Sequence, residues 1–347
     1  SSSSSSSKTT ATISHAADAD AAGTADAVCS SLHDALVAFH KKHYSANQMR
    51  LTILSPLPVD RLSALAAMYF SNIPNTNAPD PALSFNFPSE PVRLPSQLSM
   101  RYDVVPVSDI RQVQLHWFLP GMQRAYRKKI WQYLADVLGD ESEGSLKSVL
   151  RNAGLVNSVV AGPSDEATHF TIFQITLALT EDGLRGVDEV VTQVYGYVRM
   201  VRDLGPQRWL WDQCRSISRV ELRFLEKSSE IDTCSDLAGD MQIYEPSDVV
   251  VGGFLWEQYD PEEIERAISA FTPANMVMTV VSKAFDGKTD REEKRYGVKY
   301  RESQIDSKLA LAWAQGKAGA AAGRKMHFPV PNTWVPTDFS VRSGIDA

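Results

Sequence analysis

The stretch RQVQLHWFL at residues 111–119 decides the fold class. Apolar side chains occupy every second position, which is the period-two pattern expected of a strand with one buried face. These positions are Val113, Leu115, Trp117 and Leu119. The same kind of pattern predicts further strands over residues 155–160, 170–179 and 275–282.

Segments with helical periodicity lie between these predicted strands. Helices are predicted over residues 128–138 and 145–153, and two longer helices have apolar stripes over residues 184–201 and 210–224. Thr180 is expected to cap the first long helix, Gly205 to end it, and Pro206 to begin the second. Strands, helices and a returning strand predict a two-layer α+β sandwich, in which helices cover one face of a mainly antiparallel sheet.

The region before this domain is divided into shorter pieces. Residues 1–27 are of low complexity and expected to be disordered. Residues 28–85 contain predicted helices at 30–46 and 59–70 around a predicted strand at 49–54, too little for a domain. We therefore interpret residues 28–85 as the end of a similar preceding domain, residues 86–98 as a proline-rich linker and residues 99–341 as a second domain, with a flexible loop at 316–325.

Composition excludes several classes of function. The 347 residues carry a formal net charge of −7, which offers no electrostatic basis for binding nucleic acid or an anionic membrane. The sequence contains no stretch of about 18 consecutive apolar residues, which is the length that a membrane-spanning helix needs. The three cysteines, Cys29, Cys214 and Cys234, are too few and too scattered for a disulfide framework, so a reducing, cytoplasmic location is expected. Because the chain opens on Ser1, we expect an internal fragment.

Catalytic motifs are missing from the sequence. Of seven histidines only His40 and His43 are close together, and the spacing H-x-x-H allows two zinc ligands on one helix face. The intervening residues are Lys41 and Lys42, with no glutamate, so a solvated helix face is the better interpretation. H-E-x-x-H, H-x-x-E-H, G-x-S-x-G, a P-loop and G-x-G-x-x-G do not occur. Ser145, at the start of a predicted helix, is expected to be its N-cap and not a nucleophile. We expect no metal, no cofactor and no catalytic residue in this chain.

Two segments are candidate binding sites. The first is an acidic turn beside Gly139 and Gly144, which is either a solvated helix start or a site for a cation such as a peptide amino terminus. Its acidic residues are Asp136, Asp140, Glu141 and Glu143. The second is a strand end of small residues, which is either an ordinary buried strand or an edge that pairs with an extended peptide. Its residues are Val159, Val160, Ala161 and Gly162.

Several long segments, in order, resemble the insulysin (insulinase, pitrilysin-type) family of zinc metallopeptidases. They include FHKKHYSANQMRLTILS from residue 39, YLADVLGDESEGSLKSVLRNAGLVNSVVAG from 133, ALTEDGLRGVDEVVTQVYGYVRMVRDLGPQRW from 178 and ANMVMTVVSKAFDGKTDREEKRYGVKY from 274. The resemblance implies four related α/β domains, in two hinged halves that enclose a peptide chamber. It places this chain at the end of the first domain and in the second domain, after the zinc motif.

The resemblance also implies a site that grips a peptide by its amino terminus. Gly139 and Glu141 match the amino-terminus pocket, and residues 159–162 match the strand that pairs with the peptide. Asp136 and Asp140 replace two histidines and make the pocket more acidic, while Ala161 replaces a glycine. Residues 228–231 lack an arginine pair tied to polyanion binding, so that regulation is not carried over.

The implied function is therefore part of a zinc metalloendopeptidase. This chain is expected to anchor substrate without the zinc site and to be inactive by itself, while zinc belongs to the parent enzyme. The implied partners are unfolded or extended peptides, the remaining first-domain and C-terminal-half segments, and a second copy in a homodimer. The alternative is a stand-alone, non-catalytic peptide-binding or structural subunit of the same family.

Overall fold

The computed structural model describes residues 20–80, 93–316 and 326–340, with side chains from residue 30 onward. The chain forms two compact units, Ser1–Ser84 and Phe85–Ala347, and each is described by itself. The disorder expected over residues 1–19 and the loop expected over residues 317–325 fall outside the described residues.

The first unit consists of two helices and extended connections. Helix α1 spans Asp20–His43, η1 spans Ala46–Gln48 and α2 spans Val59–Phe70. Helix α1 starts ten residues earlier than predicted, so residues 20–27, which we expected to be disordered, are helical. Their alanine content explains the difference, because alanine has the highest helix propensity.

The strand predicted over residues 49–54 is wrong, because these residues form no ladder. A strand needs a neighbour to take up its backbone N–H and C=O groups, and the described part of the first unit supplies none. Its larger apolar side chains remain accessible, with Leu36 59% and Phe39 55% exposed.

The second unit is built on a seven-stranded sheet in the order β3-β4-β2-β5-β1-β7-β6. The only parallel neighbours in this sheet are β1 and β5, and every other pair is antiparallel. The strands are β1 Met100–Val104, β2 Arg111–Pro120, β3 Val156–Glu166, β4 Phe170–Leu179, β5 Met276–Ser282, β6 Arg291–Glu292 and β7 Lys299–Gln304.

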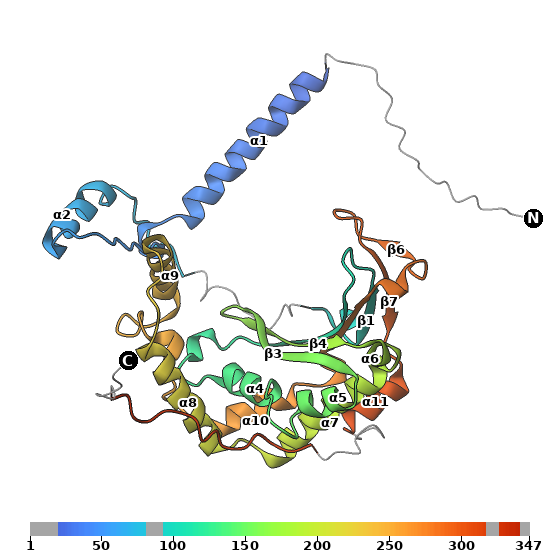
Figure 1. The fold of residues 1–347 in the computed structure, drawn as a ribbon. Helices are drawn as coiled ribbons and strands as arrows, with labels where there is room; N and C mark the ends of the chain where they lie inside the picture. The colour runs from blue at the N-terminus through green and yellow to red at the C-terminus, as the bar shows by residue number, and fades with distance from the viewer. Residues whose placement is uncertain (1–19, 81–92, 317–325, 341–347) are drawn as a thin grey trace, which may run out of the picture. The chain divides into compact units, whose positions relative to one another are not determined.

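Helices cover one face of this sheet, with α4, α5, α7 and α10 lying beneath it in Figure 1. The helices of the unit are α4 Ile130–Leu138, α5 Leu146–Asn152, α6 Glu181–Arg185, α7 Val187–Leu204, α8 Arg208–Arg223, α9 Glu230–Ile243, α10 Pro261–Ser269 and α11 Ser307–Ala314. The predicted two-layer α+β architecture with a mainly antiparallel sheet is confirmed.

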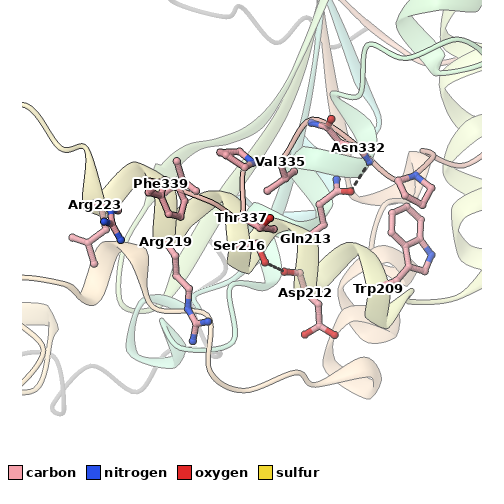
Figure 2. A pocket seen from close by; sticks show the side chains of 14 residues that line it. Trp209, Asp212, Gln213, Ser216, Arg219, Arg223, Asn332, Val335, Thr337 and Phe339 are labelled. Carbon is pink, nitrogen blue, oxygen red and sulfur yellow. Dashed lines mark hydrogen bonds between the residues drawn. The ribbon is translucent and has the colours of Figure 1, made fainter. Parts of the chain in front are cut away.

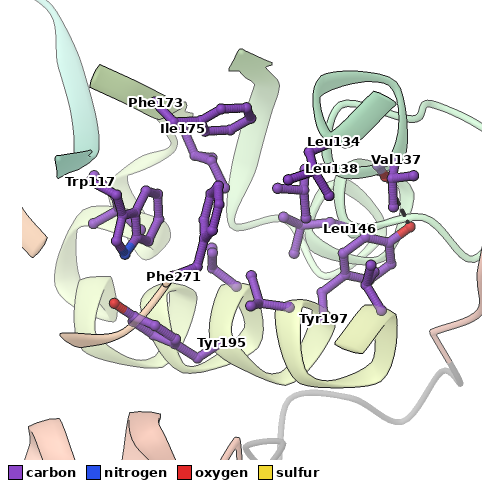
Figure 3. Packing of buried hydrophobic residues seen from close by; sticks show 14 of the residues in the cluster. Trp117, Leu134, Val137, Leu138, Leu146, Phe173, Ile175, Tyr195, Tyr197 and Phe271 are labelled. Atoms are coloured by element: carbon purple, nitrogen blue, oxygen red, sulfur yellow. Dashed lines mark hydrogen bonds between the residues drawn. The ribbon is translucent and has the colours of Figure 1, made fainter. Parts of the chain in front are cut away.

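The core lies between the sheet and the helices (Figure 3). Trp117 and Phe173 project from neighbouring strands and meet Phe271 at ring-centroid distances of 5.0 and 4.9 Å. Tyr195 of α7 meets Trp117 edge-on at 6.2 Å. Such offset and edge-to-face contacts add to the burial energy of large aromatic side chains, so they hold α7 firmly against the sheet.

The long helix predicted to start at Thr180 is interrupted. Thr180 caps α6, where its Oγ1 accepts the Gly183 N–H at 3.0 Å, and the chain breaks at Gly186 before α7 begins. A Cβ on Gly183 would lie 1.9 Å from the carbonyl oxygen of Leu155, so the close packing of α6 on that loop requires glycine. Helix α8 begins at Arg208, two residues after the predicted Pro206.

Candidate functional site

The acidic turn connects α4 to α5. Gly139 caps α4 by donating its N–H to the Ala135 carbonyl at 2.8 Å. Ser145 caps α5, where its Oγ accepts the Ser148 N–H at 3.2 Å, as predicted from its place at a helix start. Gly144 has φ +77°, in the left-handed region that favours glycine. The turn therefore has a cap at each end and a left-handed residue at Gly144.

The start of this turn lies against the edge strand. A Cβ on Gly139 would lie 3.8 Å from both the backbone nitrogen and the Cβ of Ala161. A Cβ on Gly162 would lie 3.7 Å from the Cβ of Ala135, one turn before Gly139. The two segments nominated from sequence therefore come together at one place.

Strand β3 lies at the edge of the sheet, with β4 as its neighbour on one side. Among the described residues, no strand pairs with its other side. Val159 is 3% exposed and faces the core opposite Leu177, while Val160 is 65% exposed opposite Thr176. Pro163 has no N–H, so this edge lacks a hydrogen-bond donor at that position.

The carboxylates of the turn do not share one environment. Glu141 forms an ion pair with Lys147 on the first turn of α5. Asp140 accepts hydrogen bonds from the backbone N–H of Ser142, at 3.2 Å, and from the Ser142 hydroxyl. The pairing of Glu141 with Lys147 was not predicted, although their separation of six residues across a tight turn makes it possible.

Asp136 and Asp140 face a cavity of about 430 Å³ beside α8. Its wall includes Cys214 and residues 329–334, whereas Glu141 is not part of it. Loss of solvent contact inside this cavity raises the pKa of Asp136, and a hydrogen bond with Cys214 partly opposes that rise. Burial also raises the pKa of the Cys214 thiol. The acidic residues thus divide between two surfaces, which the sequence did not indicate.

The C-terminal strap, residues 326–340, runs along α8 (Figure 1). The backbone N–H of Asn332 donates to Gln213 Oε1 at 2.7 Å, and Phe328 meets Trp209 at a ring-centroid distance of 6.2 Å. Between α8 and the strap lies a groove of about 820 Å³, whose labelled side chains in Figure 2 include Trp209, Ser216 and Phe339. The strap therefore packs against α8 within the second unit.

The uncovered face of the sheet carries a hollow of about 1020 Å³. Tyr102, Phe118 and Tyr300 give it an aromatic lining, and His116 lies among them. Burial lowers the pKa of His116, while a hydrogen bond with Gln174 works in the opposite direction. This face can therefore accommodate an apolar or aromatic chain segment.

The residues that the structure describes do not form a zinc site. Within the described ranges no group of three or more His, Cys, Asp or Glu side chains could hold a metal ion. His40 stacks on Tyr44 at 4.7 Å and His43 lies 4.5 Å from Phe39, both between ring centroids. Separately, no helix in the described part of the chain combines the length and hydropathy needed to cross a membrane.

Two family models match the chain in succession. The model described as the peptidase M16 inactive domain matches residues 31–218, and that described as the middle or third domain of peptidase M16 matches residues 222–346. The first covers more than half of the 347 residues. Together with the fold, these matches define the class of protein as a peptidase-family domain. The chain belongs to the M16, or insulinase, family of metallopeptidases.

Individual relatives agree with this assignment. The chain is 32% identical over 308 residues to the insulin-degrading enzyme of Bos taurus, covering 89% of this chain and 29% of that protein. It is 28% identical over 315 residues to nardilysin of Homo sapiens, covering 90% and 27%. The chain therefore spans less than a third of the length of these curated relatives.

A solved structure shares the fold. The crystal structure of pitrilysin superposes with a TM-score of 0.80 at 23% identity, and the match covers 88% of this chain and 32% of pitrilysin. The periplasmic protease PqqL from Escherichia coli matches more distantly, with a TM-score of 0.53 at 11% identity over 81% of this chain and 30% of that one.

Proposed function

We propose that this chain is the part of an M16 zinc metalloendopeptidase that anchors the amino terminus of a peptide substrate and lines the chamber around it. The observation that carries the proposal is the close approach of Gly139 to Ala161, which joins an acidic turn to a free strand edge. The zinc-binding residues belong to the remainder of the enzyme, and no chemical step is assigned to this chain.

The acidic turn and the free edge of β3 would recognise different parts of one peptide. A peptide α-ammonium is a hydrogen-bond donor and a cation, so it fits the turn beside the Glu141 carboxylate. The residues that follow the amino terminus are extended, and their backbone can continue the sheet along residues 158–162 of β3. Backbone pairing depends little on side chains, so the site would accept many sequences that share a free amino terminus.

Anchoring one end of a peptide would assist cleavage elsewhere. A bound amino terminus holds the downstream bonds at a limited distance from the zinc, which replaces a bimolecular search by a local one. The aromatic hollow on the uncovered sheet face supports the chamber role, because it offers apolar contact area to the downstream residues. This arrangement requires the other segments of the enzyme as partners, and a homodimer of the assembled enzyme is compatible with it.

The test is a titration of the chain with a fluorescent unstructured peptide, used once with a free and once with an acetylated amino terminus. We expect the free form to bind more tightly. Glu141→Ala should weaken binding of the free form by about 1 kcal/mol, roughly fivefold, because an exposed charged hydrogen bond is lost. Glu143→Ala is the matched control, since it removes the same charge two residues away. Equal dissociation constants for the two peptides would contradict the proposal.

A stand-alone peptide-binding or structural subunit is the second candidate. The match to a model described as inactive favours it. Peptide binding without any need for further segments, together with no stimulation of cleavage when the rest of an M16 enzyme is supplied, would select this alternative.

A further inference from the structure

The C-terminal strap lies directly on the acidic turn at one residue. The backbone N–H of His327 donates to the carbonyl oxygen of Gly144 at 3.0 Å. The His327 imidazole occupies the space over Gly144, because a Cβ on that glycine would lie 2.1 Å from the ring atoms Cδ2 and Nε2. A hydrogen bond and a ring contact at Gly144 thus join segments that are 183 residues apart in sequence.

His327 is itself held in place. Its Nδ1 lies 2.9 Å from the Phe328 carbonyl oxygen, and the Phe328 ring packs beside Trp209 of α8. Further along the strap, Asn332 bonds to Gln213 of the same helix. The imidazole therefore belongs to a strap that is attached to α8 by these contacts.

Gly144 is the point at which the turn is least constrained by its own side chains. At φ +77° a glycine reaches many other backbone conformations at little energetic cost. With no ring over it, the turn could relax there, and Glu141 and Gly139 would move with it because they precede it by three and five residues. The His327 ring fills the space over Gly144 and so restricts that movement.

We propose that His327 is a positioning residue, which fixes the turn of residues 139–145 in the geometry that receives a peptide amino terminus. The inference rests on the proposed function of this turn and adds a residue that reaches it from the other end of the domain. His327 does not contact the peptide; it acts through Gly144. The ring supplies the packing, and its backbone N–H supplies the bond.

The test compares three variants of the full chain by titration with the free and acetylated peptides. His327→Ala removes the ring and keeps the backbone donor, and it should weaken binding of the free peptide about 3–10-fold while leaving the acetylated peptide unchanged. His327→Phe restores a flat ring and should stay within about twofold of wild type. Val330→Ala, at a 57% exposed position of the same strap, is the control and should bind as wild type does.

Hydrogen exchange of residues 139–146 gives a second readout that does not depend on peptide. In His327→Ala the amide exchange rate of residues 139–146 should rise, and the exchange rate of β4 should stay unchanged. If the wild type prefers the free peptide and His327→Ala keeps that preference in full, the positioning role is overturned and the peptide site stands. If the wild type binds the free and the acetylated peptide equally, both the proposed peptide site and the positioning role of His327 are contradicted. Unchanged exchange in the turn would also overturn the positioning role.

Discussion

The carboxylate of Glu141 is paired with the ammonium group of Lys147 across the turn that joins α4 to α5. The two groups differ in accessibility, since the side chain of Lys147 is 16% exposed and that of Glu141 is 70% exposed. A peptide amino terminus that binds beside Glu141 therefore has to compete with, or share, a cation that the protein already supplies.

Removal of Lys147 should consequently improve the site. We expect Lys147→Ala to strengthen binding of a peptide with a free amino terminus about 2–5-fold, which corresponds to the roughly 0.5–1 kcal/mol of an exposed ion pair. Lys147→Arg keeps the charge and should leave the dissociation constant unchanged. Titration at low ionic strength is the measurement, because salt screens the effect. Weaker binding by Lys147→Ala would mean that Glu141 does not receive the ammonium group.

A side chain at Gly139 should damage both the turn and its contact with β3. A Cβ there would lie 2.8 Å from the Ala135 carbonyl oxygen, and the branches of valine would reach toward Ala161. We expect Gly139→Val to lower the free energy of unfolding by about 1–3 kcal/mol and to weaken peptide binding at least tenfold. The control is Gly239→Ala in α9, where a Cβ meets nothing within 4 Å. That variant should gain up to about 1 kcal/mol of stability and bind normally.

Strand addition at β3 can be tested on the ligand, with the protein unchanged. Alternate residues of an added strand direct their N–H groups toward the neighbouring edge. A peptide N-methylated at one alternating set of residues should lose about tenfold or more in affinity, and the peptide methylated at the other set should bind nearly as the parent does. Two methylated peptides with the parent's affinity would show that the backbone of β3 is not used.

The stability of the chain should depend on pH through Lys129. This residue is 6% exposed, its ammonium donates to the carbonyl oxygens of Gly252 at 3.2 Å and Gly253 at 2.7 Å, and burial lowers its pKa from 10.5 to about 8. Between these two pKa values the unfolded chain holds a proton that the folded chain has released. The free energy of unfolding therefore gains a contribution that rises with pH above 8 and is constant below it.

Comparison with Lys129→Met isolates that contribution, because the other groups titrate equally in both proteins. We expect the stability difference in favour of the wild type to grow by about 1–2 kcal/mol between pH 8 and pH 9.5. Denaturant unfolding at fixed ionic strength is the measurement. A difference that stays constant over this interval would show that the ammonium keeps its ordinary pKa.

Local sequence patterns predicted part of this fold and missed the rest for identifiable reasons. The alternation at residues 111–119 and the cap at Ser145 are properties of neighbouring residues, and both are confirmed. The strand predicted over residues 49–54 shows the same local preference, but no partner strand lies beside it in the described part of its unit. Strand β6, of two exposed residues, has no buried face and so left no pattern to detect.

The candidate site likewise has features that the sequence predicted and features that only the structure shows. The nomination of Gly139, Glu141 and residues 159–162 came from residue types and from a family resemblance, and their roles stay predictions. Sequence separation alone would group Asp136 with Glu141, yet a helix end directs Asp136 toward a cavity shared with Cys214 while Glu141 turns to Lys147. His327 carried no signal at all, because its relation to Gly144 exists only after the chain has folded back.

The sequence by itself determined the periodicity of β2, β3, β4 and β5, the caps of α5 and α6, and the family, because these depend on residues close together in the chain. Only the tertiary structure decided that β3 lies at an edge, that Gly139 meets Ala161 and that the strap closes over Gly144. Those relationships join residues that are far apart in sequence. They are set by packing of the sheet against its helices, which fixes distances that no local preference encodes.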